Sequence, residues 1–245
     1  MYNVTFVSKE LVAERTMLFR FTKPVGPDDT PVFDFVAGQS IDLTLIDPPE
    51  TDAEGNTRAF SLVSAPHEET LAIATRMRDT AFKRTLAGME PGARLHVDGP
   101  FGSFFLHENS VRTAVMIAGG IGVTPFFSIA KDAAKRGLPH KIILFYSNRR
   151  PEDAPFLKEF AQLAKDNPNF VCVPTMTDIR KSSLPWDGEV GFIDHTMFVE
   201  YVPKGANAIY YLAGPPRLVT GMRTLLTAMK VSPDDVRFEE FTGYV

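Results

Sequence analysis

A glycine-rich turn between a buried strand and a helix is the feature that most constrains this chain. The apolar run 113–118 leads into Gly119-Gly-Ile-Gly-Val-Thr-Pro125, and a helix-like stretch follows as far as Arg136. Glycines let the backbone approach an oxygen-rich ligand, and a helix start directs unpaired N–H groups at negative charge. The segment therefore predicts a phosphate cradle, with a tight strand-to-helix turn that binds nothing as the alternative.

The limits of that helix are also indicated by the sequence. Thr124 is a candidate N-cap, Pro125 suits the first helical position, and Gly137 suits the stop.

The turn is not the Gly-x-Gly-x-x-Gly dinucleotide fingerprint, because Pro125 stands where the third glycine belongs. It is not a P-loop either, because no Gly-Lys-Ser/Thr follows.

Residues 1–108 have the pattern of an antiparallel β domain. Apolar and polar residues partly alternate in short runs that Gly, Pro and Asp separate. The polar connection 47–57 is expected to form an exposed hairpin tip. Several short strands at this spacing predict a small antiparallel barrel. The expected strands are 3–13, 17–22, 40–46, 58–63, 70–77 and 94–98, with one helix over 80–87.

Residues 109–245 instead alternate between strands and helices. Each strand is a short, nearly continuous apolar run, which is typical of a parallel sheet covered on both faces. Ligands of such sheets bind beyond the carboxyl ends of the strands, so the Gly119 turn and the turn at Ala213-Gly-Pro-Pro216 are expected on one rim. The expected strands are 113–118, 141–146, 170–174, 208–212 and 236–238, and the expected helices are 125–136, 153–166, 195–202 and 216–229.

Composition excludes several classes of protein. The 245 residues are 44% apolar and carry a net charge of −4, which is ordinary for a globular protein and predicts no nucleic-acid partner. No apolar run approaches the ~18 residues of a membrane span, and the first residues lack a signal-peptide layout. With Cys172 as the single cysteine, no intrachain disulfide or four-thiolate cluster can form, and a cytoplasmic location is expected. No metal is expected, since ligand-like spacing is lacking among His67, His96, His107, His140 and His195.

One predicted strand carries an arginine, an aromatic and a hydroxyl in close succession, as Arg58-Ala59-Phe60-Ser61. Period-two alternation puts Arg58 and Phe60 on one face and Ala59 and Ser61 on the other. Arginine pairs with a pyrophosphate, an aromatic lies against a flat ring, and a serine hydroxyl reaches a ring nitrogen. A strand with Phe60 packed in the core and Arg58 in solvent is the alternative.

Six motifs follow one another along the chain: Gly38-Gln39, Arg58-x-Phe60-Ser61, Gly99-Pro100-x-Gly102, Gly119-Gly-x-Gly-x-Thr-Pro125, Gly214-Pro-Pro and Phe241. Their order and spacing resemble those of the ferredoxin–NADP reductase superfamily, and the resemblance covers essentially the whole chain. In that family a flavin-binding barrel precedes a nicotinamide-nucleotide domain, and the two rings meet in the cleft between them. The resemblance therefore implies a FAD-binding barrel over 1–108 and an NAD(P)-binding α/β domain over 109–245.

The resemblance also assigns residues to each cofactor. Arg58 would hold the flavin pyrophosphate, Phe60 would lie against the isoalloxazine, and Ser61 would contact it near N5. Phe241 or Tyr244 would cover the other face of the flavin. Further flavin contacts are implied for Ala59, Ala74, Thr75, Arg76, Thr80 and Ala81. The nicotinamide nucleotide would be bound by Gly119, Gly120, Gly122, Thr124, Ala213, Gly214 and Pro215.

The chain departs from the family pattern at three places. The common tyrosine is Phe60, which keeps the stacking surface but loses a phenol hydroxyl. The common cysteine before Gly-Pro-Pro is Ala213, which removes a thiol from the nicotinamide region. Asp79-Thr80-Ala81 lacks the glycines that are usual at the start of the barrel's helix.

The reaction implied is hydride transfer between nicotinamide C4 and flavin N5, followed by electron exchange with another molecule. Ser61, Glu240 and Phe241 are the residues expected beside the reacting rings, and no general base is required. The pair Glu239-Glu240 is the candidate carboxylate of the site, with a solvated strand end as the alternative.

The cofactors expected are FAD, with FMN as the alternative flavin, and NADH or NADPH. The cations of Ser147-Asn-Arg149-Arg150 favour a 2′-phosphate, whereas Asp178 would repel one, with Arg180 and Lys181 close by. This balance leans towards NADH.

Since no ferredoxin module is expected within the chain, electrons would pass to a separate ferredoxin-like protein, another redox protein or a small molecule. Two other functions stay open. The first is a flavin reductase that releases its flavin as product, and the second is a nucleotide-binding subunit that docks to a partner without turnover.

Overall fold

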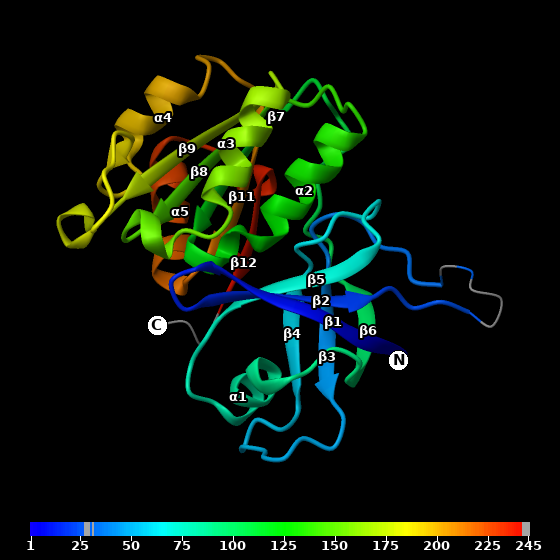
Figure 1. Ribbon diagram of the computed structural model, residues 1–245. Helices are drawn as coiled ribbons and strands as arrows, with labels where there is room; N and C mark the ends of the chain where they lie inside the picture. The colour runs from blue at the N-terminus through cyan, green and yellow to red at the C-terminus, as the bar shows by residue number, and fades with distance from the viewer. Residues whose placement is uncertain (27–29, 31, 242–245) are drawn as a thin grey trace.

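The computed structural model describes residues 1–26, 30 and 32–241, and they form two sheets that follow one another in the chain (Figure 1). The first sheet is six-stranded and antiparallel in the order β4-β3-β6-β1-β2-β5. Its edges meet, because Leu62 pairs with Ile73 and Val63 N–H donates to the Ala72 carbonyl at 2.8 Å. The predicted barrel is therefore confirmed. Its elements are β1 (Tyr2–Ala13), β2 (Thr16–Thr22), β3 (Ser40–Leu45), β4 (Thr57–Ser61), β5 (Thr70–Arg76), α1 (Ala81–Gly88) and β6 (Arg94–Phe101).

The second sheet is six-stranded and parallel in the order β10-β9-β8-β7-β11-β12. The strand order reverses between β7 and β11, which is where ligands of such sheets bind. Its strands are β7 (Thr113–Gly119), β8 (Ile142–Asn148), β9 (Phe170–Met176), β10 (Glu189–Val190), β11 (Ala208–Gly214) and β12 (Val236–Glu240), and its helices are α2 (Thr124–Lys135), α3 (Leu157–Asp166), α4 (His195–Tyr201) and α5 (Pro216–Ala228).

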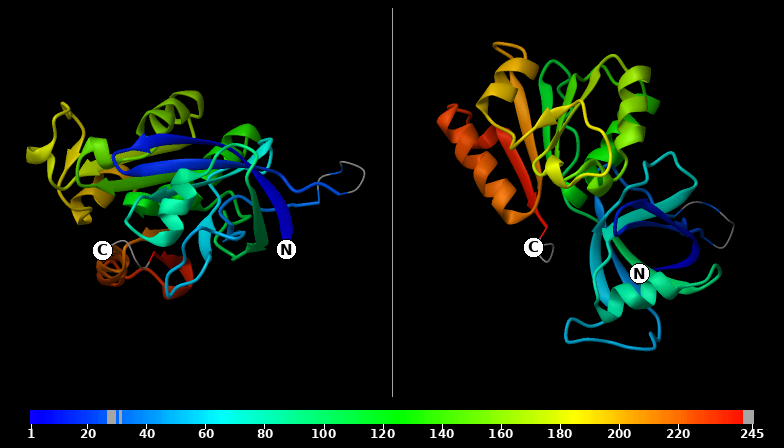
Figure 2. Two further views of the ribbon diagram at one scale, coloured as in Figure 1. Left: turned by 60° about the horizontal axis from the view of Figure 1, so that its bottom comes forward. Right: turned by 60° about the vertical axis from the view of Figure 1, so that its left-hand side comes forward.

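The helices cover both faces of the parallel sheet, as the apolar strand runs predict. The right-hand view of Figure 2 shows the sheet between α5 on one side and α3 on the other. Residues of β7 alternate between the two cores, with Met116 in the cluster under α2 and α3, and Ile117 in the cluster under α4 and α5. Strands buried on both faces account for the continuous apolar runs of the sequence.

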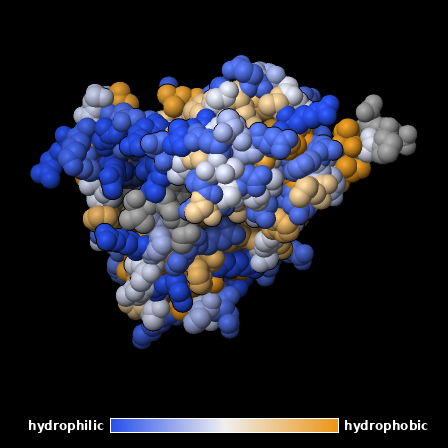
Figure 3. All heavy atoms as spheres, turned by 90° about the horizontal axis from the view of Figure 1, so that it is seen from below, coloured by the Kyte–Doolittle hydropathy of each residue, from blue (hydrophilic) through white to orange (hydrophobic). Residues whose placement is uncertain are grey.

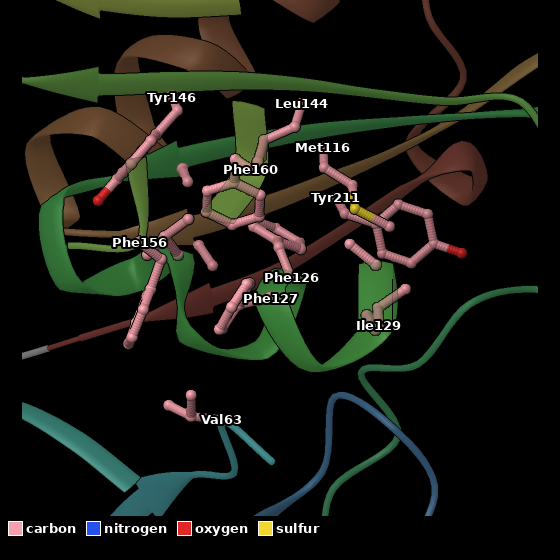
Figure 4. Close-up of a cluster of buried hydrophobic side chains, with 14 of the residues drawn as sticks. Val63, Met116, Phe126, Phe127, Ile129, Leu144, Tyr146, Phe156, Phe160 and Tyr211 are labelled. Carbon is pink, nitrogen blue, oxygen red and sulfur yellow. The ribbon is translucent and has the colours of Figure 1, made fainter. Parts of the chain in front are cut away.

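Helix α2 also packs against the barrel, so one hydrophobic cluster runs through both halves. Phe126 and Phe127 of α2 belong to this cluster together with Val63 and Ala74 of the barrel half. Figure 4 shows Val63 below α2 and the aromatic side chains of the sheet above it. The shared core fixes the position of the barrel beside the carboxyl ends of the parallel strands.

Most expected elements agree with the structure to within two residues at each end, and two differ by more. The helix expected over 153–166 begins only at Leu157, because Phe156 has a left-handed backbone with φ +62° and follows Pro155. The strand expected over 94–98 continues to Phe101, because Phe101 pairs with Ser40 of β3. The short strand β10 was not predicted, since Glu189–Val190 is too short to show a pattern. The hairpin tip expected over 47–57 connects the antiparallel strands β3 and β4, as predicted.

Candidate functional site

The glycine turn after β7 leads into α2 through a 3₁₀ turn over Gly120–Val123. Gly120 has φ +54°, and a Cβ added to it would meet nothing within 4 Å, so its backbone faces open space. The prediction of Thr124 as N-cap is wrong, because the 3₁₀ turn extends the helical structure upstream. The Thr124 hydroxyl instead donates to the Ile121 carbonyl at 3.1 Å, and Pro125 is the second residue of the helix. The free N–H groups therefore lie nearer to Gly120 than expected.

The turns after β7 and β11 lie backbone to backbone. A Cβ on Gly122 would stand 2.3 Å from the Ala213 carbonyl oxygen, and one on Gly214 would stand 3.0 Å from the Gly119 nitrogen. Gly214 also has φ +155°, which disfavours other residues. The two turns predicted to share one rim are thus in direct contact.

A cavity of about 490 Å³ opens beside these turns, at the carboxyl ends of the parallel strands. This volume is in the usual range for a cofactor site. Its apolar wall includes Phe192, whose side chain is 80% exposed. No sequence pattern marks Phe192, because it follows a two-residue strand in a loop without periodicity. Its cationic residues are Arg76, Arg149 and Arg217.

The cations around this cavity differ in what they already bind. Arg150 pairs with Asp153 at 2.9 Å and with Glu14 of the barrel at 2.7 Å, so it joins the two halves. Within the described part of the chain, the side chain of Arg149 has no ion pair or hydrogen bond. Asp178 lies outside the cavity lining and pairs with Lys181 at 2.6 Å, which lowers the pKa of its carboxyl.

On the barrel, Arg58 and Phe60 project from the same face of β4, as the alternation predicts. The Arg58 guanidinium lies 5.2 Å from the centre of the Phe82 ring, and the Phe60 ring lies 5.9 Å from it. Phe60 is 7% exposed, and Ser61 is buried as well, whereas Ala59 is exposed. The face of β4 that carries Arg58 and Phe60 therefore abuts α1.

Arg58 is one of several cations near the start of α1. Thr80 caps this helix, because its hydroxyl accepts from the Lys83 N–H at 3.3 Å, and the Lys83 ammonium donates to the Arg76 carbonyl at 2.6 Å. Burial and the charges of Arg78, Arg58 and Arg76 lower the pKa of Lys83 to about 8. A cluster of like charges at a helix N-terminus is suited to an anion.

The barrel strand β5 runs between this cluster and the parallel sheet. Ala74 is buried in the core shared with α2, and Thr75 is buried as well. Arg76, the last residue of the strand, lines the cavity at Gly119 and Gly120. The strand β5, for which the resemblance implies flavin contacts, therefore leads from the barrel to the glycine turn.

The end of β12 brings a carboxylate and an aromatic residue to the junction. Glu239 faces the barrel, since a Cβ on Gly102 would stand 3.8 Å from its Oε1, and burial raises its pKa to about 7. Glu240, the residue predicted for the site, is exposed, because alternation along the strand points it away. Phe241 donates its N–H to the Gly214 carbonyl at 2.9 Å, next to the glycine turns. Tyr244 lies outside the described residues.

Known proteins match the chain over both halves. The model of the oxidoreductase NAD-binding domain matches residues 116–224. One component of the Na(+)-translocating NADH-quinone reductase of Klebsiella pneumoniae is 29% identical over 208 residues, which are 78% of this chain and 50% of that protein. The propane 2-monooxygenase reductase component of Mycolicibacterium goodii is 29% identical over 228 residues, covering 90% of this chain and 62% of that protein. The chain thus spans about half the length of the first relative.

Solved structures match almost the whole chain. The Amycolatopsis cytochrome P450 reductase GcoB has a TM-score of 0.79 and 26% identity, covering 98% of this chain and 69% of that one. A ferredoxin NADP+ reductase from Neisseria gonorrhoeae has the same fold, with a TM-score of 0.77 and 20% identity, covering 97% of both chains. Together with the two sheets and the position of the cavity, these matches show an oxidoreductase with the fold of the ferredoxin–NADP reductase superfamily, a fold that NAD(P)H-dependent flavoprotein reductases share.

Proposed function

We propose that this protein oxidises a nicotinamide nucleotide at the cavity beside the glycine turns and reduces a flavin that is held by the barrel. The observation that supports this most directly is the position of Arg76. Its side chain lines the nucleotide cavity, and its carbonyl accepts from Lys83 of the cationic cluster. One residue therefore joins the two anion-binding regions, as expected when two phosphate-bearing cofactors meet.

The residues present fit both cofactors. On the nicotinamide side, the open backbone at Gly120 and the start of the helical segment offer N–H groups to a pyrophosphate. On the flavin side, Lys83, Arg58 and the N-terminus of α1 offer positive charge to a phosphate. FAD is the flavin proposed, with FMN as the alternative, since the cationic cluster serves the phosphate of either.

The bound cofactors would supply the redox chemistry itself, by passing a hydride from the nicotinamide to the flavin. The chain's own contribution is to bind and orient. Ala213 and Gly214 would border the nicotinamide, Ser61 and Phe60 would contact the flavin ring, and Phe241 would cover its other face. Thr124, buried and bonded to Ile121, would act by holding the turn in shape. Other cofactor contacts are proposed for Ala59, Ala74, Thr75, Thr80, Ala81, Gly119, Gly122, Pro215 and Tyr244.

Glu239, rather than Glu240, is the carboxylate that we propose for the site. Its side chain is half-buried between β12 and Gly102, and its pKa of about 7 leaves both protonation states populated at neutral pH. A group with this property can hold or release a proton beside the junction of the two halves.

Both nicotinamide cofactors are expected to be accepted. The sequence leans towards NADH because of Asp178, but the ion pair between Asp178 and Lys181 weakens the repulsion of a 2′-phosphate. Arg149 lines the cavity and has no ion pair within the described residues, so it is available to a phosphate.

We further propose that residues 1–108 act as the flavin domain, residues 109–245 act as the nucleotide domain, and electrons leave to a separate redox protein or small molecule. The names of the relatives, which include a monooxygenase reductase component and a part of a quinone reductase, support a separate acceptor. No helix among the described residues is long and apolar enough to cross a membrane.

A visible spectrum of the purified protein, recorded before and after anaerobic addition of NADH, tests the proposal. A flavin absorbance near ~450 nm that bleaches with NADH is the expected result. A protein that binds neither added FAD nor added FMN would overturn it. The same preparation, assayed with ferricyanide as acceptor, separates an enzyme from a subunit that only binds nucleotides.

A further inference from the structure

The hydrogen-bonding groups of Arg58 are already directed at its own hairpin. Its guanidinium pairs with Asp52 at 3.0 Å and with Glu54 at 3.0 Å. The same side chain donates to the backbone carbonyls of Glu54 at 2.9 Å, Gly55 at 3.0 Å and Thr57 at 2.8 Å. Only 20% of the Arg58 side chain is exposed, so these partners enclose the guanidinium.

The two acids stand next to a cluster that attracts anions. Arg58, Arg78 and Arg76 lie close enough to Lys83 for their charges to lower its pKa, and Glu54 is close enough to act in the opposite direction. A phosphate placed there would be attracted by all of these cations, but it would compete with Asp52 and Glu54 for Arg58. The competing carboxylates are carried by the connection between β3 and β4, and the Glu54 side chain is 75% exposed.

Among the described residues, other acids at this end of the barrel pair with a different cation. Glu50 of the same connection pairs with Arg84 of α1 at 2.5 Å, and Asp79 pairs with Arg84 too. The barrel end with α1 and this connection is at the bottom of Figure 1 and faces the viewer in Figure 3, where hydrophilic residues are interspersed with a few hydrophobic ones. Asp52 and Glu54 therefore pair with Arg58, whereas Glu50 and Asp79 on the same charged surface pair with Arg84.

We infer that Asp52 and Glu54 are a built-in competitor of the flavin phosphate, which makes the flavin exchangeable rather than permanently held. This inference rests on the proposed flavin site. With flavin bound, the guanidinium would turn from the hairpin carboxylates to the phosphate. Without flavin, the hairpin would close on Arg58. The affinity for flavin then depends on how much more tightly Arg58 binds the phosphate than the hairpin carboxylates, and not on the cations alone.

Binding of three flavins distinguishes this role from others. Riboflavin lacks the phosphate, FMN carries one phosphate, and FAD carries a pyrophosphate. Fluorescence quenching titrations would give Kd values for each flavin with the apoprotein of the wild type and of the double variant D52N/E54Q. We expect FMN and FAD to bind about tenfold more tightly to the variant, and riboflavin to bind within about twofold of the wild type.

The double variant D47N/E50Q is the matched control. It removes two negative charges from the same connection, and neither residue touches Arg58. The inference would be overturned if D52N/E54Q gained no more affinity for FMN and FAD than this control does. It would also be overturned if D52N/E54Q gained as much affinity for riboflavin as for FMN and FAD. If the wild type and both variants bind none of the flavins, the proposed function fails and the inference fails with it. Thermal unfolding of each variant confirms that it is folded.

Discussion

The buried hydroxyl of Ser128 in α2 donates to the backbone carbonyl of Ser64 at 2.7 Å, and this bond joins the two halves of the molecule. Ser64 follows the strand β4, whereas α2 follows the glycine turn. Beside this bond, Lys131 pairs with Glu68 at 2.6 Å. The position of the glycine turn relative to the barrel thus depends on a few polar contacts together with the shared hydrophobic core.

Replacing Ser128 with alanine is expected to lower the free energy of unfolding by about 1–3 kcal/mol, because a buried carbonyl loses its donor. Urea unfolding of the wild type and S128A measures the change. The control is T224A, which removes a hydroxyl that donates to the Thr220 carbonyl at 3.0 Å on an exposed face of α5. Equal stability losses in S128A and T224A would contradict the role of the buried bond.

Replacing Gly122 with alanine is expected to destabilise the protein by about 2 kcal/mol, because the new Cβ would overlap the Ala213 carbonyl. Binding of NADH at the cavity should also weaken, because the new Cβ would push the two glycine turns apart. Gly221 offers the comparison, since it lies in α5, lines the same cavity and has nothing within 4 Å of an added Cβ. There, alanine should be neutral or stabilising by up to about 1 kcal/mol. Thermal unfolding distinguishes the two, and an unchanged G122A would show that the turns are not tightly packed.

Glu239 is expected to make stability depend on pH. Its pKa of about 7 in the folded protein lies above the ordinary value of 4.5, so the folded state binds more protons between these values. Stability should therefore fall as the pH rises from about 4.5 to about 7 and should then level off. E239Q removes the buried charge and should be more stable than the wild type at pH 8 by about 2 kcal/mol, with a smaller gain at pH 5.

The exposed neighbour Glu240 supplies the control for this measurement. E240Q should follow the wild-type profile, because its side chain stays in water in the folded protein. Denaturant unfolding at a series of pH values gives the three profiles. A wild-type profile that coincides with that of E239Q would rule out the raised pKa.

Arg149 is expected to determine how well NADPH is used. R149Q should raise KM for NADPH about tenfold and change KM for NADH by less than about threefold, because only the 2′-phosphate needs the cation. R180Q removes a charge close by that does not line the cavity. Steady-state kinetics with ferricyanide as acceptor measures both cofactors. Equal effects on NADH and NADPH would assign Arg149 to a part of the nucleotide that both share.

Phe192 is expected to contribute to nucleotide binding through its exposed ring. F192A should raise KM for NADH about fivefold and leave the flavin spectrum unchanged, because Phe192 lines the cavity from the loop after the edge strand β10, which carries none of the proposed flavin contacts. Phe101, whose side chain is 43% exposed and does not line this cavity, gives the control F101A. Comparable effects of F192A and F101A on KM would remove Phe192 from the site.

The sequence was sufficient to predict both sheets, because the two halves differ in period. Alternation identified the barrel strands, and continuous apolar runs identified the strands that are buried on both faces. Local backbone detail was less accessible. In the 3₁₀ turn that displaces the N-terminus of α2 from Thr124, Gly122 packs against Ala213. The left-handed Phe156 that delays α3 stacks on Phe127 with 4.4 Å between the ring centres, so both details involve contacts between residues far apart in the sequence.

The sequence predicted the parts of the candidate site that contain glycine turns. It did not predict which neighbouring side chain faces the site, because that depends on burial in the folded protein. The contact between the Gly119 and Gly214 turns follows from their places at neighbouring strand ends. The choice between Glu239 and Glu240 depends on which side of β12 faces Gly102, and this is set by the tertiary fold. Likewise, the pairing of Arg58 with Asp52 and Glu54 depends on how the hairpin folds back, which no local pattern encodes.

The pairing of β7 with β11, which lies much later in the chain, limits the order in which the two proposed sites can form during synthesis on the ribosome. Every strand of the barrel has been made by Phe101, so the barrel and its cationic cluster can fold while the rest of the chain is still being translated. The cavity of the proposed nucleotide site is lined by Gly119 together with Pro215 and Arg217, and it must wait until the segment after β11 has left the exit tunnel. A nascent chain of this protein would therefore gain its two proposed cofactor sites one after the other, with the flavin side first.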